Sequence, residues 1–164
     1  MQIVEFTGGS LRFLESVPAH PPVDGFVWIF LDRENLREAL PTLQAAAHRL
    51  GGSALLDLHV KDLENATHPS HYDFTSVYDL VIFRRLATPD EVDRELQANG
   101  TAVRAVPALG SFYRIRTRAV AFVVYDRLLV TVHPAACLTA RSFIGRYLSD
   151  VVQSEGVATN RSRL

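Results

Sequence analysis

The stretch Phe26-Val27-Trp28-Ile29-Phe30-Leu31-Asp32 decides the fold class of this sequence. Its aromatic and β-branched side chains follow one another without a polar break until Asp32, a pattern typical of a strand that is covered on both faces. A sheet covered on both faces needs a layer of other elements above it and another below it. The stretch therefore predicts an α/β protein in which helices flank a sheet.

A helix is predicted directly after this strand. Asp32 offers a cap, and Gly51-Gly52 ends the pattern. The apolar residues at helical spacing are Leu36, Leu40, Leu43, Ala47 and Leu50. Pro41 lies inside the pattern, which leaves two possibilities open: a kinked helix, or a main helix that begins at Pro41. Residues 53–63 predict a second short helix, which ends before the turn 67–71.

Further strands are expected on both sides of this unit. Residues 2–6 and 11–14 alternate around Thr7-Gly8-Gly9-Ser10 and predict a hairpin. Later strands are predicted at 77–86, 111–117, 120–125 and 128–133, the last two joined across Asp126-Arg127. The side chains expected to be largely buried are Trp28, Ile29, Val81, Phe83, Val123 and Val130.

Two more helices complete the predicted fold. Residues 89–99 read as an exposed helix that Pro89 opens. Pro134 is expected to open the last helix, which places Ala140, Ile144, Tyr147, Leu148 and Val151 on one face. The elements together predict a single domain at residues 1–153, with a mixed sheet layered between helices as an αβα sandwich, and a polar tail at 154–164.

Composition narrows the classes of function. The 164 residues carry a formal charge of -1, so no basic surface for nucleic acid is expected. The amino terminus lacks the pattern of a secretion signal, and the longest apolar run, 119–125, is far shorter than the about 20 residues of a membrane helix. Cys137 is the single cysteine, which excludes an internal disulfide and predicts a small buried thiol within a helix.

Few residues suggest chemistry. His68, His71 and Asp73 could ligate a metal and would then support a small metal-dependent hydrolase, but Pro69 makes this stretch a turn rather than a metal-binding helix. No nucleophile elbow and no phosphate-binding loop is present in the sequence. The residues therefore predict a protein that is not an enzyme.

Several stretches in order resemble the CorA-type transporters of magnesium and cobalt. The tryptophan-bearing strand 26–32 is similar to the one that precedes the first helix of that family. The remaining matches are Leu58-His59-Val60-Lys61-Asp62-Leu63-Glu64-Asn65, His68-Pro69, Tyr78-Asp79-Leu80-Val81-Ile82-Phe83-Arg84 and Leu129-Val130-Thr131-Val132-His133. Together they run from about Phe26 to Leu148.

The resemblance implies the cytoplasmic amino-terminal domain of a divalent-cation transporter, on the inner side of the membrane, cut off before the stalk and membrane helices. The family's Gly-Met-Asn motif is absent, because Met1 is the only methionine. The full-length protein would be a homopentamer, and the present chain a monomer or weak oligomer. The ion could be magnesium, cobalt, nickel or zinc, and two apolar stretches of about 20 residues would follow Leu164 in the gene.

The resemblance also implies a regulatory site. It gives Asp62 the role of a weak Mg²⁺ (or other divalent-cation) ligand, completed by an aspartate on the stalk helix of a neighbouring subunit. Lys61 departs from the acidic residue that is common at its position. Two other functions stay open beside this one: the hydrolase that uses His68, His71 and Asp73, and a free-standing interaction module.

Overall fold

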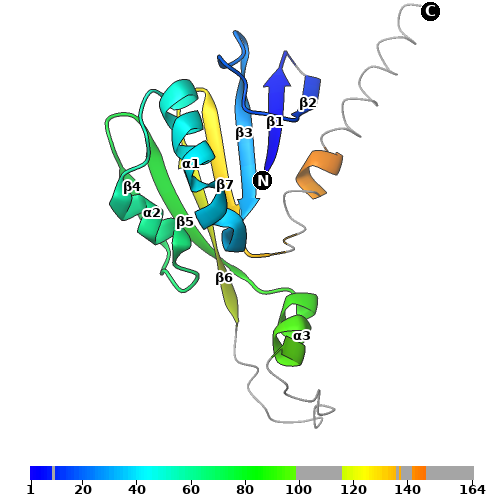
Figure 1. Cartoon of the computed structure of the whole chain (residues 1–164). Coiled ribbons are helices and arrows are strands. Elements are labelled where there is room, and N and C mark those ends of the chain that lie inside the picture. The colour runs from blue at the N-terminus through cyan, green and yellow to red at the C-terminus, as the bar shows by residue number, and fades with distance from the viewer. Residues whose placement is uncertain (9, 99–115, 136, 138–141, 147–164) are drawn as a thin grey trace, which may run out of the picture.

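The computed structural model describes residues 1–8, 10–98, 116–135, 137 and 142–146. Its centre is a seven-stranded sheet with the order β2-β1-β3-β7-β6-β5-β4 (Figure 1). The strands are β1 (Gln2–Thr7), β2 (Ser10–Leu14), β3 (Gly25–Asp32), β4 (His71–Phe74), β5 (Asp79–Leu86), β6 (Thr117–Val124) and β7 (Leu128–His133). The helices are α1 (Leu36–Ala46), α2 (Asp57–Glu64) and α3 (Pro89–Ala98). The predicted α/β class with a mixed sheet is confirmed.

The sheet is mixed because of one pair of strands. β3 and β7 run parallel, with Trp28 opposite Leu129, whereas all other neighbouring strands are antiparallel. The predicted hairpins β1–β2 and β6–β7 are both present. The stretch that predicted the fold therefore occupies the third position of the seven, where strands cover both of its edges.

The main core lies between the sheet and the helices α1 and α2, which share one face of the sheet (Figure 1). Alternate residues of each strand point toward these helices, because successive side chains of a strand point to opposite faces. The residues with no more than 2 % exposure in this core include Ile29, Leu36, Leu43, Leu63, Leu80, Val123 and Val130.

A smaller apolar cluster occupies the opposite face of the sheet. It joins Val4, Phe6, Trp28 and Ile144, and Ile144 belongs to a helical turn at 142–146. This turn packs on the face of the sheet opposite α1 and α2. The other residues predicted on the inner face of the last helix, Ala140, Tyr147, Leu148 and Val151, lie outside the described residues, as does the tail 154–164.

The first helix runs through Pro41 without a break in its α-helical residues, so the main helix does not begin there. A 3₁₀ turn (Arg33–Asn35) precedes it, and a π-helical turn (Ala47–Gly51) follows it. Gly52 then has a left-handed backbone (φ 87°), and its N–H donates to His48 O at 3.1 Å. Glycine adopts this conformation without steric cost, which explains why the helix ends at Gly51-Gly52 as predicted.

Three local predictions are wrong, and a fourth lies partly outside the described residues. Phe83 is 55 % exposed and Val81 is half-buried, although both were expected to be buried. The two side chains point away from the α1 and α2 layer, which Leu80 and Ile82 face instead. Residues 71–74 were expected to belong to a turn, whereas they form β4. None of these residues is buried, so the strand carries no apolar pattern that would predict it. Pro134, Ala135 and Cys137 are not helical, and Cys137 is half-buried rather than buried. The start of the predicted strand at 111–117 lies outside the described residues, and β6 begins at Thr117.

No helix within the described ranges is both long and apolar enough to cross a bilayer.

Candidate functional site

Asp62 lies on α2, the short helix that the main core holds in place. His59, Val60 and Leu63 bury the inner side of α2, and Asp62 stays partly accessible, with a side chain that is 20 % exposed. Arg33 anchors the end of the helix, because its Nε donates to Leu63 O and its Nη2 donates to Ala119 O, both at 2.9 Å. The fold therefore presents the Asp62 carboxylate from a fixed helix.

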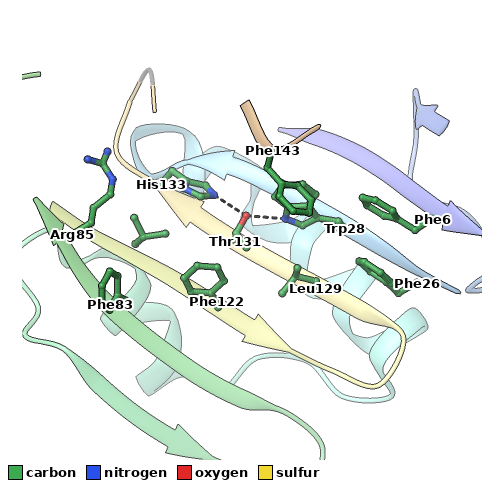
Figure 2. A pocket seen from close by; sticks show the side chains of 11 residues that line it. Phe6, Phe26, Trp28, Phe83, Arg85, Phe122, Leu129, Thr131, His133 and Phe143 are labelled. Atoms are coloured by element: carbon green, nitrogen blue, oxygen red, sulfur yellow. Dashed lines mark hydrogen bonds between the residues drawn. The ribbon is translucent and has the colours of Figure 1, made fainter. Parts of the chain in front are cut away.

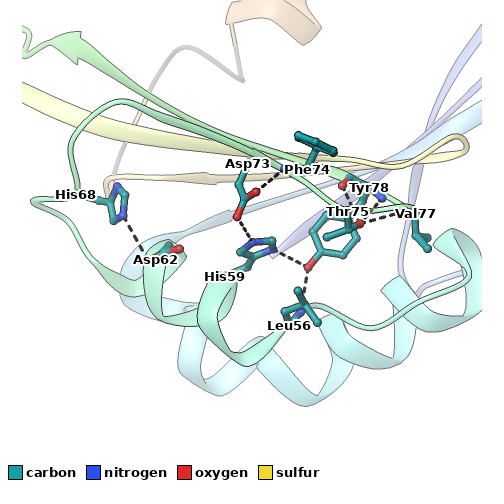
Figure 3. A network of polar contacts seen from close by, with 9 residues as sticks. All are labelled: Leu56, His59, Asp62, His68, Asp73, Phe74, Thr75, Val77 and Tyr78. Carbon is teal, nitrogen blue, oxygen red and sulfur yellow. Dashed lines mark hydrogen bonds and ion pairs between the residues drawn. The ribbon is translucent and has the colours of Figure 1, made fainter.

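His68 is the partner of Asp62 (Figure 3). Its Nε2 lies 3.3 Å from Asp62 Oδ1, and the His68 side chain is 17 % exposed. Its Nδ1 lies 2.9 Å from Pro69 O, a carbonyl that can only accept a hydrogen bond. A proton on Nδ1 can be donated to that carbonyl, and a proton on Nε2 can be donated to Asp62 Oδ1.

The loop that carries His68 is held by backbone contacts. The His68 N–H donates to Asn65 O at 3.2 Å, and Arg84 of β5 donates through Nη1 to His68 O at 2.9 Å. Arg84 also donates through Nε to Thr117 Oγ1 at 2.8 Å, so β5 and β6 support the loop together. This arrangement fixes the distance between the loop and α2.

A second polar network lies one turn earlier on α2 (Figure 3). The hydroxyl of Tyr78 accepts the Leu56 N–H at 3.0 Å and lies 2.7 Å from His59 Nδ1. His59 Nε2 lies 3.1 Å from Asp73 Oδ2. A neutral His59 satisfies every atom if Tyr78 donates to Nδ1 and Nε2–H donates to Asp73. This network joins α2 to β4 and to the residue that precedes β5.

The bond from His59 lowers the pKa of the Asp73 carboxyl, and the bond from the Phe74 N–H lowers it further. Burial raises the pKa of the Tyr78 phenol. His59 is only 2 % exposed. The centre of this network is therefore shielded from solvent, and its role is to stabilise the fold.

The three residues of the hydrolase hypothesis do not form one site. Asp73 bonds to His59, and His68 bonds to Asp62, whereas His71 is exposed at the start of β4. The rings of His68 and His71 lie 5.6 Å apart between their centroids. Across the described residues, no group of three or more His, Cys, Asp or Glu side chains is placed to hold a metal ion.

A groove lies on the face of the sheet opposite α1 and α2, and the sequence did not indicate it (Figure 2). The groove has a volume of about 500 Å³, and aromatic side chains from four strands line most of it. At its floor Trp28 Nε1 donates to Thr131 Oγ1 at 2.9 Å, and Thr131 Oγ1 lies 2.8 Å from His133 Nε2. The residues that line the groove alternate along strands that are far apart in the sequence. They form one surface only because the strand order of the sheet places these strands side by side.

Arg85 lies at one end of this groove and connects it to α3. Its Nη1 donates to Glu91 Oε2 at 2.9 Å, and its Nη2 contacts Glu91 Oε1. This contact with Arg85 lowers the pKa of the Glu91 carboxyl to about 2, and it raises the pKa of Arg85 above its usual range. The guanidinium is therefore already neutralised by Glu91.

Comparison with known proteins gives evidence at the level of fold. No protein-family model matches the sequence, and no curated protein matches it significantly. Among solved structures, the ZntB cytoplasmic domain from Vibrio parahaemolyticus matches with a TM-score of 0.54 and 8% identity, over 91% of this chain and 49% of that one. The CorA magnesium transporter from Methanocaldococcus jannaschii matches with a TM-score of 0.52 and 11% identity, over 94% of this chain and 37% of that one.

The chain therefore spans about half of the first structure and little more than a third of the second. Both similarities cover nearly all of its length, so they concern the whole sheet and its helices rather than a local motif. The protein has the fold shared by the cytoplasmic domain of ZntB and the matching part of CorA.

Proposed function

We propose that this chain is the cytoplasmic regulatory domain of a CorA-type transporter of divalent cations, and that it senses the cation through Asp62. The main support is the fold, which matches a ZntB cytoplasmic domain and a CorA magnesium transporter over more than nine tenths of the chain. The order of the matching sequence stretches, from the strand of Trp28 to the strand of His133, supports the same family independently of the fold.

Asp62 suits the sensing role in position and in chemistry. It stands on a helix anchored by buried side chains, and its carboxylate is partly open to solvent. Mg²⁺ prefers oxygen ligands and keeps several of its waters, so one fixed carboxylate gives weak binding until a neighbouring subunit supplies further oxygens. His68 would compete with the cation for the carboxylate, because its Nε2 lies 3.3 Å from Asp62 Oδ1.

This mechanism assigns each residue a simple task. α2 would present the Asp62 carboxylate to a divalent cation, an acidic side chain of the stalk would supply a further oxygen ligand, and the bound cation would favour the closed arrangement of subunits. A ligand shifts such an equilibrium only by its difference in affinity for the two states. The full-length assembly would be a homopentamer, and the isolated chain a monomer or weak oligomer.

The test uses the full-length transporter in vesicles, with cation flux measured against internal Mg²⁺. We expect Asp62→Asn to weaken or abolish the closure that Mg²⁺ causes, because the amide removes the charge that binds the cation. Asp57→Asn is the matched control, since Asp57 is exposed on the same helix. Closure at an unchanged Mg²⁺ concentration in Asp62→Asn would refute the sensing role, and a gene without two downstream membrane stretches would refute the assignment to a transporter.

A further inference from the structure

The contact between Asp62 and His68 has a spacing that suits a metal ion as well as a hydrogen bond (Figure 3). Asp62 Oδ1 and His68 Nε2 lie 3.3 Å apart. In a tetrahedral zinc site the metal lies about 2.0 to 2.2 Å from each nitrogen or oxygen ligand, which places two such ligands about 3.3 to 3.5 Å from each other. The two atoms therefore already have the spacing of zinc ligands.

The other ring nitrogen of His68 supports the same role. Nδ1 lies 2.9 Å from Pro69 O, and a carbonyl oxygen accepts hydrogen bonds but donates none. In a neutral ring, a proton on Nδ1 leaves the lone pair of Nε2 on the side of Asp62. Histidines that bind metals almost always donate their other N–H to a carboxylate, a backbone carbonyl or water in this way. The hydrogen bond to Pro69 thus selects the form of His68 that can bind a metal.

Both side chains are held in place and remain within reach of an ion. The His68 N–H donates to Asn65 O, and Arg84 Nη1 donates to His68 O, so the loop is fixed at both sides of its peptide. Asp62 belongs to α2, whose inner side is buried in the main core. The side chains of Asp62 and His68 are 20 % and 17 % exposed. An ion can therefore approach the pair without unfolding of the loop.

The donor set distinguishes one class of cation from another. Mg²⁺ prefers oxygen ligands, whereas imidazole nitrogen suits Zn²⁺ and its neighbours among the transition metals. His68 should therefore act in opposite directions on the two ions. It competes with Mg²⁺ for the Asp62 carboxylate, but it supplies a second ligand to Zn²⁺.

We propose that Asp62 and His68 together form a binding site for a transition-metal ion of the Zn²⁺ type, which the pair binds more tightly than Mg²⁺. Among the described residues no further His, Cys, Asp or Glu completes this set, so water fills the other positions around the ion in the isolated chain. The use of the site within a transporter rests on the proposed function of Asp62. Binding itself is a property of this chain and needs no transporter to be measured.

The first experiment measures the binding of Zn²⁺ and of Mg²⁺ to the full 164-residue chain by isothermal titration calorimetry at constant pH. We expect Asp62→Asn and His68→Ala each to lower the Zn²⁺ affinity about tenfold or more, since even a residue that only supports a ligand contributes about tenfold. For Mg²⁺, Asp62→Asn lowers the affinity, whereas His68→Ala leaves it unchanged or raises it.

The matched control is His48→Ala, which removes an exposed histidine from the turn that follows α1 and should change neither affinity. A loss of Zn²⁺ affinity that is no larger for His68→Ala than for His48→Ala would overturn the proposal. An unsubstituted chain that binds Mg²⁺ as tightly as Zn²⁺ would overturn it as well.

A second measurement does not depend on how well the variants fold. NMR of the histidine ring nitrogens in the unsubstituted chain follows each ring while Zn²⁺ is added. We expect the signal of His68 Nε2 to shift before that of any other histidine, with the proton on Nδ1 retained. A first shift at another histidine, or binding through His68 Nδ1, would contradict the site.

The outcomes separate this site from the sensing role of Asp62. If Zn²⁺ binding is independent of His68 while Asp62→Asn still abolishes the closure that Mg²⁺ causes in the transporter, only the transition-metal site is overturned. If Zn²⁺ binding needs both residues while Asp62→Asn leaves closure by Mg²⁺ intact, the site is supported and the sensing role is refuted.

Discussion

Single residues that line the groove on the sheet face opposite α1 and α2 differ sharply in how much they stabilise the fold. Trp28 is 6 % exposed, packs against Phe30 and Phe143, and donates a hydrogen bond to Thr131. Phe83 lines the same groove and is mostly open to solvent. The stability that each ring contributes should follow its burial rather than its size.

We therefore expect Trp28→Ala to lower the free energy of unfolding by about 3 to 5 kcal/mol, because it leaves a cavity and an unpaired hydroxyl at Thr131. Phe83→Ala is the matched control and should cost less than about 1 kcal/mol. Urea unfolding followed by far-ultraviolet circular dichroism measures both without relying on tryptophan emission. Similar losses for the two variants would contradict the dependence of stability on burial.

Tyr78 offers a second test at this scale. Tyr78→Phe removes the hydroxyl that accepts the Leu56 N–H and contacts the buried His59 ring, and it leaves both groups without that partner. We expect a loss of about 1 to 3 kcal/mol in the free energy of unfolding. Tyr72→Phe removes the same atom from a ring that is 58 % exposed and should change little. Equal losses in urea unfolding would contradict the network of Tyr78, His59 and Asp73.

At the scale of elements, polar contacts hold the first turn of α3 in place. Thr88 and Glu91 form a capping box: the Thr88 N–H donates to Glu91 Oε2 at 2.8 Å, and the Glu91 N–H donates to Thr88 Oγ1 at 3.3 Å. Arg85 holds the same carboxylate from β5. The first turn of α3 is thus attached to the end of β5 through one charged side chain.

This attachment predicts a dependence on pH. The pKa of Glu91 is about 2 in the folded protein against an ordinary value of 4.5, so its contribution to stability is complete above pH 4.5 and is lost as the pH falls toward 2. We expect Glu91→Gln to cost on the order of 3 kcal/mol near pH 7 and progressively less in acid. Asp93→Asn, an exposed change on the same helix, should cost little at either pH. A cost for Glu91→Gln that stays constant between pH 7 and pH 3.5 would contradict the ion pair.

The elements that the sequence predicted are those whose apolar pattern is local. The run before Asp32, the helix ended by Gly51-Gly52 and the pair of strands around Asp126-Arg127 each carry their signal within a few neighbouring residues. β4 escaped prediction because His71-Tyr72-Asp73-Phe74 buries none of its residues and gains its order from pairing with β5. Phe83 was wrongly predicted to be buried, because a continuous apolar run does not show which of its residues face the helices α1 and α2.

At the scale of the whole molecule, sequence predicted the fold better than the site. The resemblance to CorA-type transporters singled out Asp62, but His68 was assigned to a different hypothesis, because the pairing of the two depends on a loop that Arg84 draws back to α2. The groove could not be predicted at all, since Phe6, Trp28 and Phe122 become neighbours only through the strand order. Both features arise from tertiary contacts that no local pattern encodes.

The final prediction concerns the isolated chain and its response to Mg²⁺. If Asp62 is one half of a site whose other half lies on a neighbouring subunit, the chain alone binds the cation weakly. At a Mg²⁺ concentration equal to the dissociation constant, binding adds about 0.4 kcal/mol to the free energy of unfolding, which corresponds to a rise in melting temperature of roughly 1 to 2 °C. Differential scanning calorimetry with Mg²⁺, and with Asp62→Asn as the control, measures this rise. A shift of many degrees at millimolar Mg²⁺ that Asp62→Asn abolishes would mean that this chain supplies all the ligands itself, and that the cation need not bridge two subunits in order to be sensed.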